Sequence, residues 1–185
     1  MATLPAFNAA EWIAENTLGG TRLTSETQET VAGFTTMWNF FESTLCGNRA
    51  SIAAFERVLE SFRPEDMTQT TSQKLAECLV FWRMRYGTPG GFSENFHGLN
   101  FRAGDRKPHV EAVLSSEGGQ PEDQLLALMI IVYRLRNNLF HGLKSLEMLN
   151  DQVHNLTNAS LCLAAILESM PSRWVTPQRR RAEGA

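Results

Sequence analysis

Cysteine and long apolar runs are both scarce in this sequence, and each shortage excludes a class of protein. Only three cysteines occur among the 185 residues, at Cys46, Cys78 and Cys162, and none belongs to a Cys-x-x-Cys pair. An odd number of widely spaced cysteines argues against a disulfide framework and is typical of buried thiols in a reducing cytoplasm. The run LLALMIIVY is far shorter than the roughly 20 residues of a membrane-spanning helix. The N-terminus lacks the basic and apolar regions of a secretory signal, so we expect a cytoplasmic protein without membrane contact.

An excess of basic charge is also missing. Seventeen lysines and arginines stand against 20 acidic residues, which gives a formal net charge of −3 and a pI of about 5.8. A total of this size produces no general attraction to nucleic acid or to an anionic membrane. Binding of RNA would therefore require a local cluster of basic side chains.

Strand signals are nearly absent, because no run of alternating β-branched residues is bounded by turns. Apolar residues instead recur at the i, i+3, i+4 spacing of amphipathic helices. We predict an all-α, up-and-down helical bundle of about five to seven helices in a single domain over residues 1–170, followed by a loose polar tail at 171–185. The predicted helices cover residues 8–17, 25–45, 50–62, 70–86, 107–115, 121–148 and 150–169.

A long loop is predicted at residues 87–108, where four glycines fall within the first dozen positions and no period is visible. A loop of this length inside a compact domain tends to be functional or disordered. Its phenylalanines Phe92, Phe96 and Phe101 interleave with the basic residues Arg102, Arg106 and Lys107, as in stacking surfaces for single-stranded RNA. The alternative is that the phenylalanines attach the loop to the bundle.

The most unusual segment is YRLRNNLFHGL at residues 133–143, where polar residues interrupt the apolar spine of the longest predicted helix. The apolar stripe continues through the segment, so we expect the polar side chains on the remaining surface of the helix. At about 100° per residue, Arg136 and His141 lie about 140° apart around the axis, whereas Arg134, Asn138 and His141 share a face. One straight helix therefore cannot easily bring Arg136 and His141 to one small group, but a two-fold dimer would.

Arg136, Asn137 and His141 in the string RNNLFH resemble the R-N-x-x-x-H form of the motif of the HEPN superfamily. Members of that superfamily are small helical bundles, and many are RNA-cutting toxins or defence effectors. Leu135 and Asn137 match the aliphatic and polar neighbours of the arginine in that motif, and the late position in an all-α chain agrees with it. The resemblance implies a metal-independent endoribonuclease that acts as a homodimer, without a cofactor, in bacterial toxin–antitoxin or antiphage defence. An antitoxin or other regulatory protein would be a further partner.

The residue types suit cleavage of RNA through the ribose 2′-OH. A histidine, with an ordinary pKa of about 6.5, can move the proton, and a guanidinium can hold the phosphoryl oxygens as negative charge develops. His141 would be the general acid or base, Arg136 the phosphate clamp and Asn137 an orienting residue. A metal-dependent nuclease would need a carboxylate cluster, and none surrounds the motif, so no metal site is predicted.

Three neighbouring residues, Arg134, Asn138 and Tyr133, are predicted to contribute to substrate binding. Tyr133 would stack on a base, and core packing is its alternative. Glu42 would pair with Arg136 or Arg134, or else be an ordinary carboxylate at the edge of its helix. For the whole chain, the alternative function is a non-catalytic dimerisation or RNA-binding module in which the polar segment is an interface.

Overall fold

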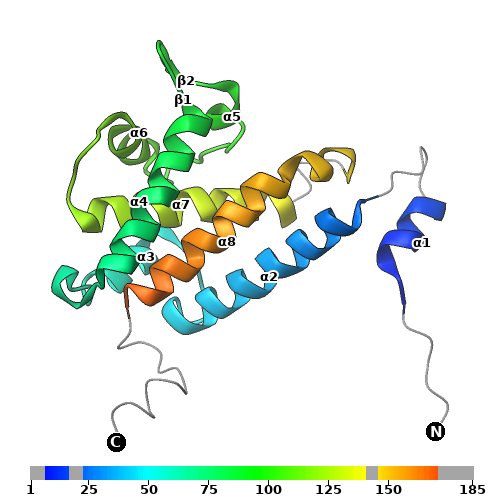
Figure 1. Ribbon diagram of the computed structural model, residues 1–185, viewed down its shortest axis with the longest axis horizontal. Coiled ribbons are helices and arrows are strands. Elements are labelled where there is room, and N and C mark those ends of the chain that lie inside the picture. Colours follow the sequence, from blue (N-terminus) through cyan, green and yellow to red (C-terminus); the bar gives the residue numbers. More distant parts are fainter. Residues whose placement is uncertain (1–6, 17–22, 141–145, 171–185) are drawn as a thin grey trace, which may run out of the picture.

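The computed structural model describes residues 7–16, 23–140 and 146–170, which form a helical bundle with one small hairpin (Figure 1). The predicted all-α class is confirmed. Over these ranges the α-helices are α1 (Ala9–Asn16), α2 (Ser25–Leu45), α3 (Ile52–Leu59), α4 (Gln69–Tyr86), α5 (Glu94–His97), α6 (Lys107–Ser115), α7 (Pro121–Phe140) and α8 (Val153–Glu168). The other elements are two 3-10 helices, η1 (Pro64–Asp66) and η2 (Leu146–Gln152), and strands β1 (Gly87–Thr88) and β2 (Gly91–Phe92). The predicted tail at 171–185 lies outside the described residues.

Side-chain hydroxyls begin three of the helices. Thr24, Ser51 and Thr68 each accept a hydrogen bond, at 3.1–3.2 Å, from the backbone N–H three residues further along. Such N-caps satisfy one of the four N–H groups that the first turn leaves unpaired. The cap of α2 is therefore Thr24, directly before the predicted first residue of the helix.

The last helix begins later than predicted because Asn150 binds a different helix. Its Oδ1 accepts hydrogen bonds from the backbone N–H of Thr24 at 3.2 Å and from the hydroxyl of Thr27 at 2.7 Å. The side chain thus ties η2 to the start of α2, and α8 starts only at Val153. The predicted helix 121–148 is helical in the described residues up to Phe140, and its residues 141–145 lie outside them.

Helix α7 lies in the middle of the bundle, where α3, α4, α6 and α8 pack against it, and α2 lies along α8 (Figure 1). Every residue from Leu125 to Val132 is buried, because the run LLALMIIV is apolar on all sides of the helix. Burial continues at Arg134, Asn137 and Asn138. The expectation that these polar side chains lie on a free surface of the helix is therefore wrong. In the described part of the chain, no helix is both long and apolar enough to cross a bilayer.

The predicted loop at 87–108 is folded and attached to the bundle. Strands β1 and β2 form an antiparallel hairpin, and α5 adds one short helix, so α-helices outnumber the predicted five to seven. Phe96 is fully buried, and the rings of Phe92 and Phe101 lie 4.3 Å and 5.2 Å from its ring. The phenylalanines therefore attach the loop to the core, as the alternative interpretation predicts.

Two ionisable groups, the partly buried Cys46 and the buried Tyr86, predict a loss of stability at alkaline pH. Burial, with a smaller contribution from Glu42, raises the pKa of Cys46 from 9.0 to about 12, and burial also raises the pKa of Tyr86. The folded chain then holds protons that the unfolded chain releases, so stability is complete below pH 9.0 and falls as the pH rises towards 12. We expect Cys46 alone to lower the free energy of unfolding by about 1 kcal/mol between pH 9 and 10.5, after allowance for its partial exposure. Urea titrations of wild type and Cys46→Ser should show a shallower decline in the variant, and identical profiles would contradict the prediction.

Candidate functional site

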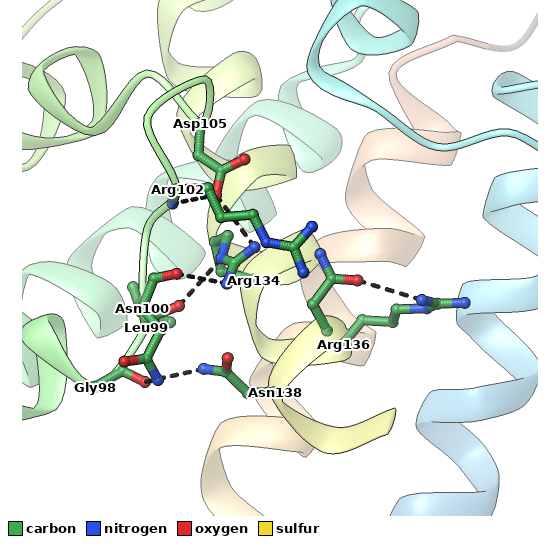
Figure 2. A network of polar contacts seen from close by, with 9 residues as sticks. Gly98, Leu99, Asn100, Arg102, Asp105, Arg134, Arg136 and Asn138 are labelled. Carbon is green, nitrogen blue, oxygen red and sulfur yellow. Dashed lines mark hydrogen bonds and ion pairs between the residues drawn. The ribbon is translucent and has the colours of Figure 1, made fainter. Parts of the chain in front are cut away.

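The polar residues near the end of α7 divide into two groups on different sides of the helix (Figure 2). Arg134 and Asn138 point towards the loop that follows α5, and Arg136 points towards α2. Asn137 contacts Arg136, whose Nη1 donates to its Oδ1 at 3.2 Å. The two groups have different chemistry, so they are described separately.

Arg134 holds the loop. Its side chain is 1% exposed, its Nε donates to the carbonyl of Leu99 at 3.1 Å, and its Nη2 donates to that of Asn100 at 2.5 Å. Its Nη1 lies 3.1 Å from Oδ2 of the buried Asp105, which also accepts from the backbone N–H of Arg102 at 2.7 Å. Burial lowers the pKa of Arg134, and the charge of Asp105 opposes that shift. Since all three side-chain nitrogens contact the loop, we assign Arg134 a structural role in place of the predicted substrate contact.

Asn138 continues the same attachment. Its Nδ2 donates to the carbonyl of Gly98 at 2.9 Å, so Asn138 and Arg134 together bind three consecutive loop carbonyls. The side chain is 1% exposed, and its Oδ1 has no hydrogen-bond partner among the described residues. The donor group of Asn138 is therefore used by the loop, and only its acceptor is left for another molecule.

Tyr133, the third predicted substrate contact, packs in the aromatic core. Its ring stacks on Trp38 at 6.1 Å and meets Phe55 edge to face at 5.6 Å. Both geometries are those that aromatic pairs prefer. The structure therefore shows the core-packing alternative for this residue.

Arg136 and Asn137 form the second group. The guanidinium of Arg136 lies over the rings of Trp38 and Phe140, at 5.6 Å and 5.1 Å from their centroids. Asn137 is buried, and its Nδ2 has no hydrogen-bond partner in the described part of the chain. No carboxylate of the described residues forms an ion pair with Arg136. The aromatic rings thus orient a guanidinium whose charge is not neutralised there, beside an amide donor, and both groups suit an anion.

Glu42 supports this arrangement indirectly. Its Oε2 accepts from the indole N–H of Trp38 at 2.9 Å, and its Oε1 accepts from the backbone N–H of Ala50 at 3.0 Å. The carboxylate therefore fixes the ring on which Arg136 lies. In the described residues it does not form the ion pair with Arg136 or Arg134 that one sequence interpretation contains.

Arg102 is a candidate that the predicted set of site residues omits. Its side chain is exposed, and it extends from the loop over α7 in the direction of Arg136 (Figure 2). It lies near enough to Arg134 for its charge to lower the pKa of that residue. By contrast, Arg106 pairs with Glu56. The sequence pattern names Arg102 only as one of the basic residues among the loop phenylalanines. The contact between the loop and α7 reveals that it lies beside the motif, from which more than thirty residues separate it in the sequence.

The predicted general acid or base, His141, lies outside the described residues, so its distance from Arg136 and Asn137 is not defined. Within the described ranges, no three histidine, cysteine, aspartate or glutamate side chains are grouped to hold a metal ion. The described candidate site therefore consists of Arg136 and Asn137 with their aromatic neighbours. His141 is assigned to it from the sequence motif alone.

Comparisons of the chain with protein-family models, with curated proteins and with solved structures found no match. The resemblance to the HEPN superfamily therefore rests on the motif residues and on the all-α fold.

Proposed function

We propose that this chain is a metal-independent endoribonuclease of HEPN type that cuts RNA at a composite site of a homodimer. The observation that supports this most directly is Arg136, which is oriented by two aromatic rings, touches Asn137 and has no carboxylate partner in the described residues. A guanidinium neutralised by an ion pair would gain little from a phosphate, whereas this one gains a counter-ion.

In the proposed reaction the ribose 2′-oxygen attacks the adjacent phosphorus, and the bond from phosphorus to the 5′-oxygen breaks. His141 accepts the proton of the 2′-OH, and the departing 5′-oxygen receives a proton from the partner's His141 or from water. Arg136 stabilises the negative charge on the non-bridging oxygens, and the buried Nδ2 of Asn137 orients the phosphate or the 2′-OH. The products carry a 2′,3′-cyclic phosphate, or its hydrolysed form, and a 5′-OH.

A homodimer agrees with two features of the chain. The helical separation of about 140° between Arg136 and His141 makes a site within one chain difficult, and a two-fold axis removes the difficulty. Phe140, beside Arg136, is a large apolar side chain that remains 48% exposed at the last described turn of α7. We place the enzyme in the cytoplasm, in toxin–antitoxin or antiphage defence, with an antitoxin or regulatory protein as a further partner.

The proposal predicts cleavage that needs a 2′-OH and no divalent metal. Purified protein should cut mixed cellular RNA in excess EDTA, and a short RNA should become resistant when the nucleotide on the 5′ side of its cleavage site lacks the 2′-OH. Gel analysis and end-group mapping would show the fragments and their cyclic phosphates. His141→Ala, purified in the same way, is the control for contaminating ribonucleases. RNA that is bound but stays intact would favour the non-catalytic module instead, and equal cutting by wild type and variant would refute the assignment.

A further inference from the structure

Three basic side chains lie where the loop meets the start of α6, and two of them are paired with carboxylates. Arg106 pairs with Glu56, and Nζ of Lys107 lies 3.5 Å from Oε1 of Glu111. Arg102 is exposed and forms no ion pair among the described residues. Of the three, Arg102 is therefore the one whose charge is available to an anion from outside.

The position of Arg102 is fixed by buried contacts of its loop. Its backbone N–H donates to Oδ2 of Asp105 at 2.7 Å, and the same carboxylate oxygen lies 3.1 Å from Nη1 of Arg134. The preceding residue, Phe101, packs its ring 5.2 Å from that of the buried Phe96. Because the backbone is held in place, less conformational entropy is lost when the side chain of Arg102 binds a ligand.

Accessibility decides which basic groups near the end of α7 can contact another molecule. Arg134 is 1% exposed, and the loop uses its side-chain nitrogens. Arg136 is partly exposed, and Arg102 is exposed. Neither Arg102 nor Arg136 has a carboxylate partner in the described part of the chain. A ligand that approaches this surface therefore meets two guanidinium groups whose charges are not neutralised there.

These two guanidinium groups belong to different sides of α7. Arg134 and Arg136 are two residues apart, so their side chains leave the helix about 160° apart. Arg102 lies near enough to Arg134 for its charge to lower the pKa of that residue, and it extends over α7 in the direction of Arg136 (Figure 2). Arg136 itself lies over the ring of Trp38 of α2. Since a helix with its side chains is only about 10–12 Å across, one extended strand can reach both groups.

We infer that Arg102 binds a second phosphate of the RNA strand whose scissile phosphate is held by Arg136. This inference rests on the proposed nuclease function. The two arginines place two positive charges close together in a chain whose net charge is −3. They form the local basic cluster that RNA binding by an acidic protein requires. Arg102 binds and positions the strand and takes no part in proton transfer, so its loss affects KM and not kcat.

The salt dependence of RNA binding tests this contact directly. Each phosphate that a basic side chain neutralises releases counter-ions, so it adds about 0.7 to the slope of log K against log salt for a single strand. Arg102→Gln should therefore reduce that slope by about 0.7 and weaken binding about fivefold at 0.1 M salt. Arg102→Lys keeps the charge and should restore most of both. The probe is a mixed-sequence, fluorescent RNA decamer with 2′-fluoro sugars, which lacks the attacking hydroxyl, and anisotropy titrations of the full chain measure its binding.

Arg106→Gln is the matched control for Arg102→Gln. It removes the same charge from another exposed arginine of the same loop, but Arg106 is already paired with Glu56. The slope and the affinity of this variant should therefore stay at their wild-type values. The midpoint of urea unfolding should be the same for Arg102→Gln and wild type, because the substituted side chain is exposed and forms no ion pair in the described residues.

Three binding results would overturn the inference: an unchanged slope and affinity in Arg102→Gln, an equal loss in Arg106→Gln, or a wild-type protein that does not bind the probe. Steady-state cleavage by the same variants distinguishes this failure from that of the nuclease. If both proposals hold, Arg102→Gln raises KM about fivefold and leaves kcat within about twofold of wild type. A reduced slope in a protein that never cuts RNA would keep the contact of Arg102 with RNA and reject the nuclease. Cleavage with an unchanged slope would keep the nuclease and reject the role of Arg102.

Discussion

Replacement of Arg134 by alanine should lower the free energy of unfolding by about 3–5 kcal/mol, the largest stability effect that we expect in this chain. Arg134 is 1% exposed, and its guanidinium forms the ion pair with Asp105 and two hydrogen bonds to loop carbonyls. Removal of one partner of a buried ion pair leaves the other charge in a poorly solvated position, and that penalty exceeds the gain from the original pair. Equilibrium unfolding in urea, followed by tryptophan fluorescence, measures the change.

Two further variants show whether Arg134→Ala is destabilising because it breaks the ion pair and hydrogen bonds or because it removes side-chain volume. Arg134→Met combined with Asp105→Leu removes both charges, so it should be less destabilising than Arg134→Ala alone. Arg136→Ala is the matched control, because that arginine is only partly buried and has no ion pair in the described residues, and it should lose less than about 1 kcal/mol. The assigned role would be contradicted if Arg134→Ala lowered the free energy of unfolding by less than about 1 kcal/mol. It would also be contradicted if the double variant were less stable than Arg134→Ala.

The attachment of the loop links stability to the site. Residues 98–105 are held to α7 by Arg134 and Asn138, and this segment carries Arg102. Loss of the attachment would release Arg102 from its place beside α7. Arg134 therefore acts as a positioning residue, and its substitution should lower both activity and stability. Substitution of Arg136 should instead lower activity with little loss of stability.

The helices were predictable because the information that forms them is local. Apolar periodicity lies within each helix, the caps of α2, α3 and α4 lie next to their first turns, and the predicted α6 at 107–115 has the observed bounds. The start of α8 was not predictable in this way, since Asn150 has the side chain of an N-cap and uses it on Thr24 and Thr27, more than 120 residues away. The same limit explains why α7 was expected to have a free face. Periodicity gives the angle of a side chain about its helix, but it does not tell which segment packs there.

In the candidate site, too, local features were predictable from the sequence and contacts between distant segments were not. The grouping of Arg136 with Asn137 was visible because they are adjacent, and the structure shows their side chains in contact. The sequence pattern places Arg102 among the loop phenylalanines, but its place beside α7 depends on the packing of the loop against that helix, which no local pattern gives. Arg134 was predicted to contact substrate because an arginine suits a phosphate, but its side chain binds the loop. Its partner Asp105 lies in the segment predicted as an unstructured loop, so the sequence did not reveal the ion pair.

The largest effects on activity should come from Arg136 and His141. Arg136→Ala should lower kcat for RNA cleavage about 10²- to 10³-fold, as the loss of one group that stabilises developing negative charge does elsewhere. His141→Ala should lower it about 10²- to 10⁴-fold through loss of proton transfer. Arg136→Lys keeps the charge but loses the two-pronged geometry and the stacking on Trp38 and Phe140, so its activity should lie between Arg136→Ala and wild type. Single-turnover cleavage of a labelled RNA, at protein concentrations that saturate binding, isolates this step.

A mixture of the two inactive variants tests whether the site is composite. If each site takes Arg136 from one protomer and His141 from the other, a heterodimer of Arg136→Ala and His141→Ala contains one complete site and one that lacks both groups. After exchange of subunits at equal amounts, about half of the dimers are mixed, so the mixture should recover about a quarter of wild-type activity. The double variant Arg136→Ala with His141→Ala, mixed with an equal amount of wild type, is the matched comparison, and co-purification of two differently tagged protomers checks exchange itself. In these mixed dimers each site lacks one group, so activity should fall from the half expected without exchange to about a quarter. A mixture of single variants that stays inactive after exchange, while the mixture of wild type with the double variant keeps half of the wild-type activity, would place both groups in one chain and would remove the reason for a composite dimer site.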